Sequence, residues 1–457
     1  MALTILAWLM IIVFMFMIMT KRLSPFTSLI IVPLVFVLIG SFMGLYATPE
    51  VEELMGGKGL LQQLLVVGEW IKMGVTKTAP TGVMLLFAIL YFAIMLNAGM
   101  FDPLTRVMLK FAGGDPMRVL IATGVVAAAV SLNGDGTTTT LITCTTFLPI
   151  YKKLNMKLMN LAVVTVLMNT IMNLLPWGGP SARVASVLPE VDTGVLLAAL
   201  APGMIVSLIY MVGVSAYMGK KERARLGIVK LSDAEISNLV APKSEEEEAL
   251  KRPKNVVFNW ILTLVLIVFL LRGWLPSLTI FMIGTIVALI VNYPNLKEEK
   301  ARIADNAGDA LQVVILVFAA GAFTGLFENS GMSTALANSI ASIIPSSWGS
   351  GWGLVTAFLS APGTFFLSND AFYYGVLPVL NQTGALYGWS ALELGTASLL
   401  GQAYHLLSPL VAFIYLLLSL TEQDLGEWQR ESAKWATGIF IIFIGMAAIT
   451  GNVPLFK

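Results

Sequence analysis

The chain has 457 residues, of which 57% are hydrophobic and only 12% are charged, about half the charged fraction of an ordinary soluble domain. Its net charge of +1 gives no field that would attract nucleic acid. One cysteine, Cys144, and one histidine, His405, exclude an intramolecular disulfide and any site that needs two cysteines or two histidines, such as a catalytic zinc centre.

Ten apolar runs are long enough to cross a bilayer as helices of about 20 residues. They begin near Ala2, Phe26, Pro80, Met156, Val195, Val256, Leu275, Leu311, Tyr387 and Ala433. The first run carries no charge at its start and is followed by Lys21 and Arg22, which favours a retained helix over a signal peptide.

Two further apolar stretches, residues 117–152 and 351–380, are too long for one crossing, and small and polar residues break each at its middle. We interpret both as re-entrant hairpins. Two of the crossings, residues 156–190 and 387–420, also contain proline and glycine and are predicted to be broken helices.

Basic segments predict the orientation of the chain in the membrane. With ten crossings these segments all fall on one side, and they comprise residues 21–22, 106–118, 152–157, 220–230 and 297–302. The loops 48–79 and 191–194 on the other side hold Glu50, Glu52, Glu53 and Asp192, with Lys58, Lys72 and Lys77 as the basic exceptions. The protein is therefore expected to span the inner (plasma) membrane many times, with both termini external.

The two halves of the chain carry matching landmarks. Leu148-Pro149 recurs as Leu377-Pro378, and Gly179-Pro180 corresponds to Ser408-Pro409, with 229 residues between the members of each pair. Five crossings per half is an odd number, so the second half must be inverted relative to the first. The sequence thus predicts an all-α polytopic membrane protein with a first repeat (1–219), a hydrophilic cytoplasmic linker (220–254) and a second, inverted-topology repeat (255–457), each repeat having five crossings and one re-entrant hairpin.

The tip of the first hairpin is the most polar interruption at membrane depth. Asn133 and Asp135 lie among glycines that allow a tight reversal, and the following threonines begin a helix whose amides and positive dipole end would favour an anion. A charge on Asp135 would be costly at this depth without a partner, so a function is expected for it.

The tip of the second hairpin repeats this arrangement with Ser368, Asn369 and Asp370. Tyr373 and Tyr374 follow it and could serve the same site or belong to an aromatic belt at the membrane interface. Four polar interruptions, two per half, are expected to meet near the middle of the membrane.

Two residues near the helix breaks have alternative interpretations. Arg183 could bind a carboxylate in a bidentate manner or face lipid headgroups as an interfacial arginine. His405 could titrate near physiological pH and take part in proton coupling, or it could be a satisfied hydrogen-bonding group.

Four stretches of sequence carry a resemblance to a known family. They read GDGTTTTLIT with LPIY, MNLLPWGGPSARVASVL, LSNDAFYYGVLPVL, and SPL with LGEWQRESAKWATG. With these motifs the chain resembles the citrate-metal:proton symporters of the CitMHS family. The resemblance implies a homodimer with scaffold and transport domains, an elevator mechanism, and import of citrate or a related tricarboxylate as a complex with a divalent cation (Mg or Ca), with the proton as coupling ion and no permanently bound cofactor.

Candidate site residues come from this resemblance and, for Ser408 and His405, from the second helix break. The substrate-binding candidates are Asn133, Gly136, Thr138, Asn173, Gly178, Gly179, Arg183, Ser368, Asn369 and Ser408, the coupling candidates are Asp135, Asp370 and His405, and the metal is expected to arrive with the substrate.

Charge supports the same class of solute. A citrate trianion bound to a divalent metal carries about one net negative charge, which lowers the cost of bringing it into the membrane. A site with Arg183 as its cation suits this complex better than a bare trianion. Two alternatives within transport remain open, namely a sodium-coupled carrier of bare di- or tricarboxylates and a passive channel. An enzyme is not indicated, because the sequence shows no nucleophile paired with a histidine.

Overall fold

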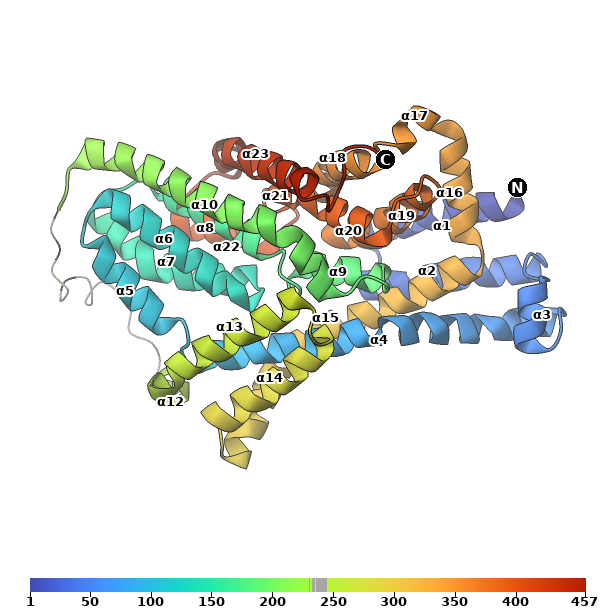
Figure 1. Cartoon of the computed structure of the whole chain (residues 1–457), viewed down its shortest axis with the longest axis horizontal. Coiled ribbons are helices and arrows are strands. Elements are labelled where there is room, and N and C mark those ends of the chain that lie inside the picture. Colours follow the sequence, from blue (N-terminus) through green and yellow to red (C-terminus); the bar gives the residue numbers. More distant parts are fainter. Residues whose placement is uncertain (230, 232–234, 236–244) are drawn as a thin grey trace.

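The computed structural model describes residues 1–229, 231, 235 and 245–457, and every regular element in these ranges is a helix (Figure 1). The middle of the predicted cytoplasmic linker, residues 220–254, lies outside the described residues. Within the described ranges, eight helices are long and apolar enough to cross a membrane. The predicted all-α polytopic class is confirmed.

The described helices fall in two halves of the chain joined by a short connection. The first half contains α1 (Ala2–Met19), α2 (Pro25–Phe42), α3 (Pro49–Met55), α4 (Leu60–Asn97), α5 (Asp102–Ala112), α6 (Pro116–Val130), η1 (Ser131–Asn133), α7 (Gly136–Lys153), α8 (Leu158–Met172), α9 (Gly179–Val187) and α10 (Thr193–Leu226). The connection contains α12 (Glu245–Leu250) and η2 (Pro253–Asn255). The second half contains α13 (Val256–Arg272), α14 (Ser277–Asn292), α15 (Leu296–Asn329), α16 (Met332–Ile343), α17 (Ser346–Gly349), α18 (Trp352–Phe366), η3 (Ala371–Val376), α19 (Leu377–Ala385), α20 (Ala391–Leu400), α21 (Gln402–His405), α22 (Ala412–Thr421) and α23 (Leu425–Ile449).

The interrupted segments fall where the sequence predicted them. The stretch 117–152 becomes α6, a single turn η1 and α7, and the stretch 351–380 becomes α18, the π-helical η3 and the start of α19. The broken helices are α8 with α9, and α20 with α21 and α22. After the break, α9 begins at Gly179 with Pro180 in its first turn, where a missing amide hydrogen leaves no helix bond unmade.

The prediction that residues 48–79 form a loop is wrong for most of that range. Residues 49–55 form α3, and residues 60–79 form the first half of α4, which continues through Pro80 to Asn97. Charged residues lowered the hydropathy of this part without breaking the helix, since Glu69 and Lys72 lie one turn apart and form an ion pair of 3.0 Å. The 38 residues of α4 span about 57 Å, well beyond a hydrocarbon core of ~30 Å.

Helices α4 and α15 pack against each other along the lower part of the molecule in Figure 1. Glycines bring the two backbones into direct contact: a Cβ atom at Gly74 would lie 2.0 Å from the carbonyl oxygen of Gly321, and one at Gly325 would lie 2.2 Å from that of Trp70. Close packing of this kind through small residues is how helices associate in lipid, where no hydrophobic force drives them together. Helices α2, α13 and α14 complete this lower layer.

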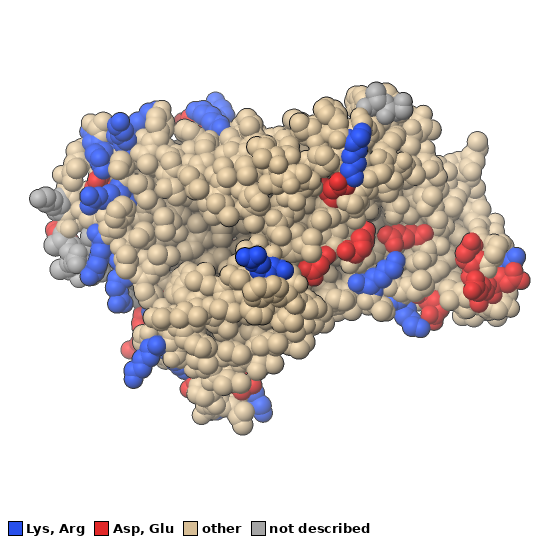
Figure 2. Space-filling view, viewed as in Figure 1, with Lys and Arg blue, Asp and Glu red and all other residues tan. Residues whose placement is uncertain are grey.

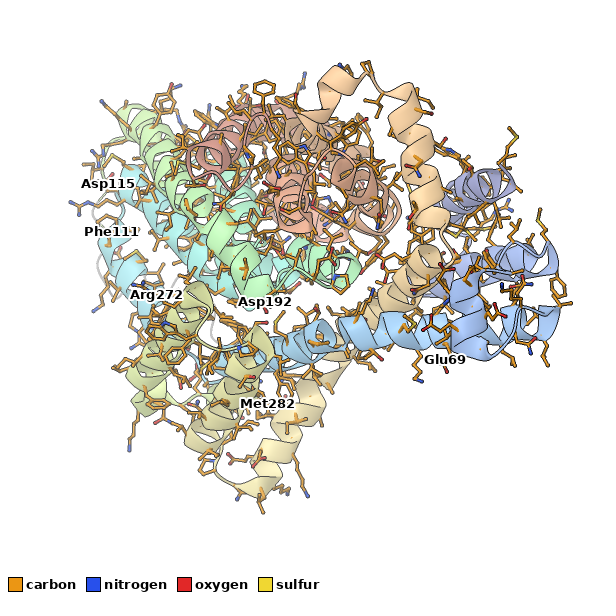
Figure 3. The ribbon with its side chains drawn as sticks, turned by 45° about the vertical axis from the view of Figure 1, so that its right-hand side comes forward. Glu69, Phe111, Asp115, Asp192, Arg272 and Met282 are labelled. Carbon is orange, nitrogen blue, oxygen red and sulfur yellow. The ribbon has the colours of Figure 1, made fainter. Side chains whose placement is uncertain are left out.

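The two hairpins and the two broken helices form the upper part of the molecule in Figure 1. Helix α6 packs on α7, α8 and α10, and α18 packs on α20 and α21. At one end of this part, Asp115 caps α6 and accepts hydrogen bonds from Arg223 in the last turn of α10, and Asp192 caps the opposite end of α10 (Figure 3).

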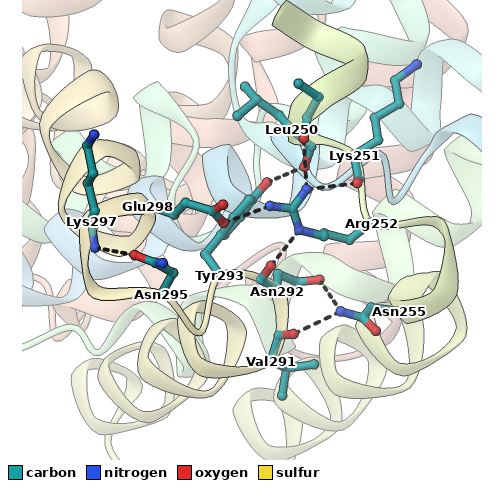
Figure 4. Close-up of polar contacts among 11 residues, drawn as sticks. Leu250, Lys251, Arg252, Asn255, Val291, Asn292, Tyr293, Asn295, Lys297 and Glu298 are labelled. Carbon is teal, nitrogen blue, oxygen red and sulfur yellow. Dashed lines mark hydrogen bonds and ion pairs between the residues drawn. The ribbon is translucent and has the colours of Figure 1, made fainter.

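Arg252 fixes the chain where it enters the second half (Figure 4). Its backbone amide donates to the carbonyl oxygen of Ala98 at the end of α4 (3.0 Å), and its Nε donates to that of Asn292 at the end of α14 (2.8 Å). Its guanidinium also pairs with Glu298 of α15 at 2.9 Å and lies over the ring of Tyr293. Arg252 thereby joins α4, α14 and α15 at the same end of the lower layer, through its backbone amide and its side chain.

Charged residues are distributed unequally between the two ends of the molecule. Lysine and arginine gather at the end formed by α5, the start of α6 and the end of α10, whereas the acidic residues Glu50, Glu52 and Glu53 lie on α3 at the other end (Figure 2).

Candidate functional site

A cavity of about 530 Å³ lies between the lower and upper parts of the molecule. One wall comes from the first hairpin tip, α9 and η3, and the other from the second half of α4 and the first half of α15. Five predicted site residues line it: Asn133, Asp135, Thr138, Gly179 and Arg183. These residues belong to both predicted interruptions of the first half.

The first hairpin tip is held by hydrogen bonds among its own residues. The side-chain oxygen of Asn133 accepts from the amide of Asp135 at 2.8 Å, and the carboxylate of Asp135 accepts from the amides of Thr137 and Thr138 at 3.2 and 2.7 Å. Asp135 is thus the N-cap of α7 and is exposed to the cavity. Two of the amides that we expected to face a ligand donate to the carboxylate of Asp135 instead. These two hydrogen bonds give the charge of Asp135 the partner that it requires.

Arg183 of α9 connects the two halves of the site. Its Nε and Nη2 atoms each lie 2.7 Å from Oδ1 of Asp370, and its Nη1 donates to the carbonyl oxygen of Gly179 at 2.9 Å. The side chains of Arg183 and Asp370 are only 22% and 18% exposed. The alternative of an interfacial arginine facing headgroups is therefore wrong, and the cation of the cavity already has an anionic partner.

The second hairpin tip is closed by a buried network. The amide nitrogen of Gln402 donates to the side-chain oxygen of Asn369 and to the hydroxyl of Tyr373, both at 2.9 Å, and that hydroxyl donates to the carbonyl oxygen of Ser398. The hydroxyl of Ser368 accepts from the amide of Ala371 at 3.1 Å. None of these groups lines the cavity.

The tyrosines after this tip do not form an interfacial belt. Both rings are buried, and Tyr374 lines the cavity on the same wall as the first hairpin tip. Residues from η3 and from the first hairpin therefore reach the same space, as the meeting of interruptions from the two halves requires.

His405 and Ser408 lie in the second helix break, away from the cavity. Nδ1 of His405 is 2.8 Å from the carbonyl oxygen of Thr364, and the hydroxyl of Ser408 accepts from the amide of Leu410 at 3.2 Å. Both side chains are buried. For His405 the structure favours the alternative of a satisfied hydrogen-bonding group.

Three further predicted residues also lie outside the lining, and two of them are glycines with steric reasons to be glycine. A Cβ atom at Gly178 would lie 2.0 Å from the carbonyl oxygen of Asn173, and one at Gly136 would lie 2.3 Å from the ring of Phe413. Gly178 therefore allows the backbone to fold back on Asn173 at the helix break, and Gly136 allows the hairpin tip to pack against the ring of Phe413. Asn173 is the third, and its backbone ends α8.

Several lining residues were not predicted. The indole of Trp177 donates to the carbonyl oxygen of Leu132 at 2.7 Å and stacks on Phe92, so it fixes the tip of the hairpin against α4. The second wall contributes the polar residues Asn97, Asn306, Asp309 and Gln312. The spacing of three between residues 306, 309 and 312 was the available signal, since it places them on one face of a helix.

The fold and this cavity, enclosed by two interrupted helical segments, define a multi-pass helical membrane transporter. A solved structure described as "Crystal structure of the Alcanivorax borkumensis YdaH transporter reveals an unusual topology" has a similar fold, with a TM-score of 0.59 over 93% of this chain and 100% of that chain at 14% sequence identity.

The family model for CitMHS, described as "Citrate transporter", matches residues 2–401, and the chain belongs to this family of transporters rather than to an enzyme family. It is 45% identical to the "Citrate transporter" of Bacillus subtilis (strain 168) and 38% identical to the "Mg(2+)/citrate complex secondary transporter" of the same organism, in each case over 99% of both chains. It is also 40% identical to the "Uncharacterized transporter YraO" of that organism, over 99% of this chain and 100% of the relative.

Proposed function

We propose that this protein is a secondary active carrier that imports citrate, or a related tricarboxylate, as a complex with Mg²⁺ or Ca²⁺, coupled to protons. The names of two relatives support the substrate. The observation that carries the proposal is the charge of the cavity: its charged lining residues in the described part of the chain are Asp135, Asp309 and Arg183, and Arg183 is paired with Asp370. A bare trianion would meet more negative than positive charge here, whereas a metal complex would bring its own cation.

Arg183 provides a route from substrate binding to proton binding. A carboxylate of the substrate competes with Asp370 for the guanidinium, since carboxylates bind this group in the same geometry. Asp370 then loses its cation while it remains mostly buried, and an unpaired carboxylate in such a place is favoured in its protonated form. Substrate and proton therefore bind together. Asp135, the exposed carboxylate of the first tip, is the second coupling group.

The layout of the chain supports an elevator mechanism. The lower layer with α4 and α15 is the scaffold, and the two hairpins with the broken helices are the transport domain. The repeats are residues 1–219 and 255–457, joined by the linker 220–254, and the basic end of the molecule faces the cytoplasm with both termini external. The carrier acts as a homodimer in the plasma membrane.

Uptake of labelled citrate into proteoliposomes tests the proposal. The assay compares Mg²⁺, Ca²⁺ and a chelator, each under a pH gradient or a sodium gradient. We expect uptake with a divalent metal under a pH gradient, and loss of uptake when the metal is chelated. Uptake of free citrate driven by sodium would instead establish a sodium-coupled carrier, and no uptake under any condition would refute citrate as the substrate.

The Asp370→Asn variant tests the coupling step. It removes the group that takes the proton, so we expect the dependence of uptake on the pH gradient to disappear while Mg²⁺-dependent citrate exchange remains. A variant that still accumulates citrate under a pH gradient would exclude Asp370 from coupling.

A further inference from the structure

The wall of the cavity opposite the hairpin tip contains a polar strip on α15. Asn306, Asp309 and Gln312 line the cavity, followed deeper along the same helix face by Val313, Leu316 and Val317. The positions recur every three or four residues, so they form one stripe of the helix. The strip belongs to the lower layer, whereas every predicted site residue belongs to the upper part.

Asp309 is the charged member of this strip. It is exposed, and no hydrogen bond or ion pair involves it among the residues that the structure describes. The nearby cation on the same helix is engaged elsewhere: Arg302 pairs with Asp305 at 2.7 Å and lies near the ring of Tyr293. Asp309 therefore presents a carboxylate without a counter-ion to the solute.

A free carboxylate repels a citrate anion, because both are negatively charged. It attracts a divalent cation, including one that keeps part of its water. Magnesium loses its waters reluctantly and retains several of them when carboxylates bind it, and these waters are hydrogen-bond donors. The side-chain oxygens of Asn306 and Gln312 can accept from the same waters.

We propose that Asp309 is a specificity-determining residue, which accepts hydrogen bonds from the waters of the substrate's metal ion and excludes metal-free tricarboxylates. This inference rests on the proposed function. It assigns the two walls different tasks: the upper wall, with Arg183 and Gly179, receives carboxylate groups, and the α15 strip receives the hydrated metal. The complex is selected because only its two chemically different sides match the two walls at once.

The Asp309→Asn variant tests the assignment in purified protein, with binding measured by titration calorimetry. One titration uses citrate with excess Mg²⁺, and the other uses citrate with a chelator. Since a hydrogen bond to a charged group is lost and a repulsion is removed, we expect the preference for the Mg²⁺ complex over free citrate to fall about tenfold. Weaker binding of the complex and tighter binding of free citrate should both contribute. Asp309→Glu, which keeps the charge, should retain most of the preference.

Asp305→Asn is the matched control. Asp305 lies on the same helix one turn away, is exposed, pairs with Arg302 and does not line the cavity, so its variant should keep the wild-type preference. An Asp309→Asn preference equal to that of the control, or an equal loss of affinity for both forms of citrate, would overturn the assignment. If the wild-type protein itself bound neither form of citrate, the proposed function would fail. If the wild-type protein preferred the Mg²⁺ complex and Asp309→Asn kept the same preference, only the role of Asp309 would fail.

Discussion

The two hairpin tips carry similar residues but have different surroundings. Asp135 of the first tip is exposed, caps α7 and lines the cavity. Asp370 of the second tip is bound by Arg183, and its neighbour Asn369 is buried against Gln402. The comparison shows that similar motifs in the two halves need not have the same role, since the first tip faces the cavity and the second tip joins the two halves.

Removing Arg183 should have the largest effect on this arrangement. Arg183→Gln leaves the mostly buried carboxylate of Asp370 without a cation, and breaking such a pair costs about 3 kcal/mol of stability in addition to the loss of transport. Thermal unfolding of the purified protein and uptake into proteoliposomes measure the two effects. The double variant Arg183→Gln, Asp370→Asn should recover stability but not transport. A single variant as stable as the wild type would mean that the pair does not join the halves.

Disrupting the network of the second tip should affect stability rather than binding. Gln402→Leu leaves the buried side-chain oxygen of Asn369 without its donor, which costs roughly 1–3 kcal/mol. Thermal unfolding should detect this loss, while the affinity for Mg²⁺-citrate changes little because Gln402 does not line the cavity. Gln312→Leu, at an exposed position of the cavity wall, is the control and should unfold as the wild type does. A large loss of affinity in Gln402→Leu would place the second tip in the binding site.

The first tip should show the opposite behaviour. Asn caps helices about as well as Asp, so Asp135→Asn should change stability by less than about 0.5 kcal/mol. The variant should still bind Mg²⁺-citrate but lose part of the pH dependence of uptake. Asp192→Asn, which changes another N-cap aspartate outside the cavity, should keep the wild-type pH profile. Identical pH profiles for the two variants would remove Asp135 from proton coupling.

The smallest effect is expected at the base of the first hairpin, at low pH. Burial opposes the charge of Asp115, but hydrogen bonds from Arg223 and from the amide of Met117, with the charges of Arg223 and Arg118, hold the pKa of its carboxyl below the usual value. Because the pKa is lower in the folded state, this stabilisation is present above the unfolded-state pKa of about 3.9 and is lost as the pH falls below it.

The second hairpin offers a contrast, since the N-cap of α18 is Gly351, which has no side chain to accept a capping hydrogen bond. Thermal unfolding of wild-type protein and Asp115→Asn should differ at neutral pH and converge as the pH falls through the lowered, folded-state pKa of Asp115. A difference that persists unchanged at low pH would contradict the contribution of the Asp115 charge.

Most of the fold could be predicted from the sequence. Each of the ten predicted apolar runs contains a helix, eight described helices are long and apolar enough to cross a membrane, and the polar stretches coincide with breaks between helices. The cost of exposing polar backbone to lipid restricts how such a chain can fold. The extent of α4 could not be predicted in this way. Its first half carries Glu69, Lys72 and Lys77, and a hydropathy pattern cannot distinguish a solvated helix from a loop.

The site was predicted only in part, and the part that was missed has one cause. Residues 133, 135, 138, 179 and 183 were identified because they interrupt apolar runs, and they do line the cavity. Asp309 begins no interruption and sits in the hydrophilic start of α15, where a charged residue is unremarkable. Only the packing of α15 against α4 brings it opposite the hairpin tip.

The sequence by itself determined the class of protein, the order of its helices and the places where those helices break, since each of these depends on local hydrophobicity and backbone chemistry. The tertiary structure decided which broken segments face the cavity and which are closed. That choice depends on pairs far apart in the chain, above all Arg183 with Asp370 and Gln402 with Asn369. Such pairs form only when separate helices have packed, because the energy of a buried charge or amide depends on what the fold places beside it.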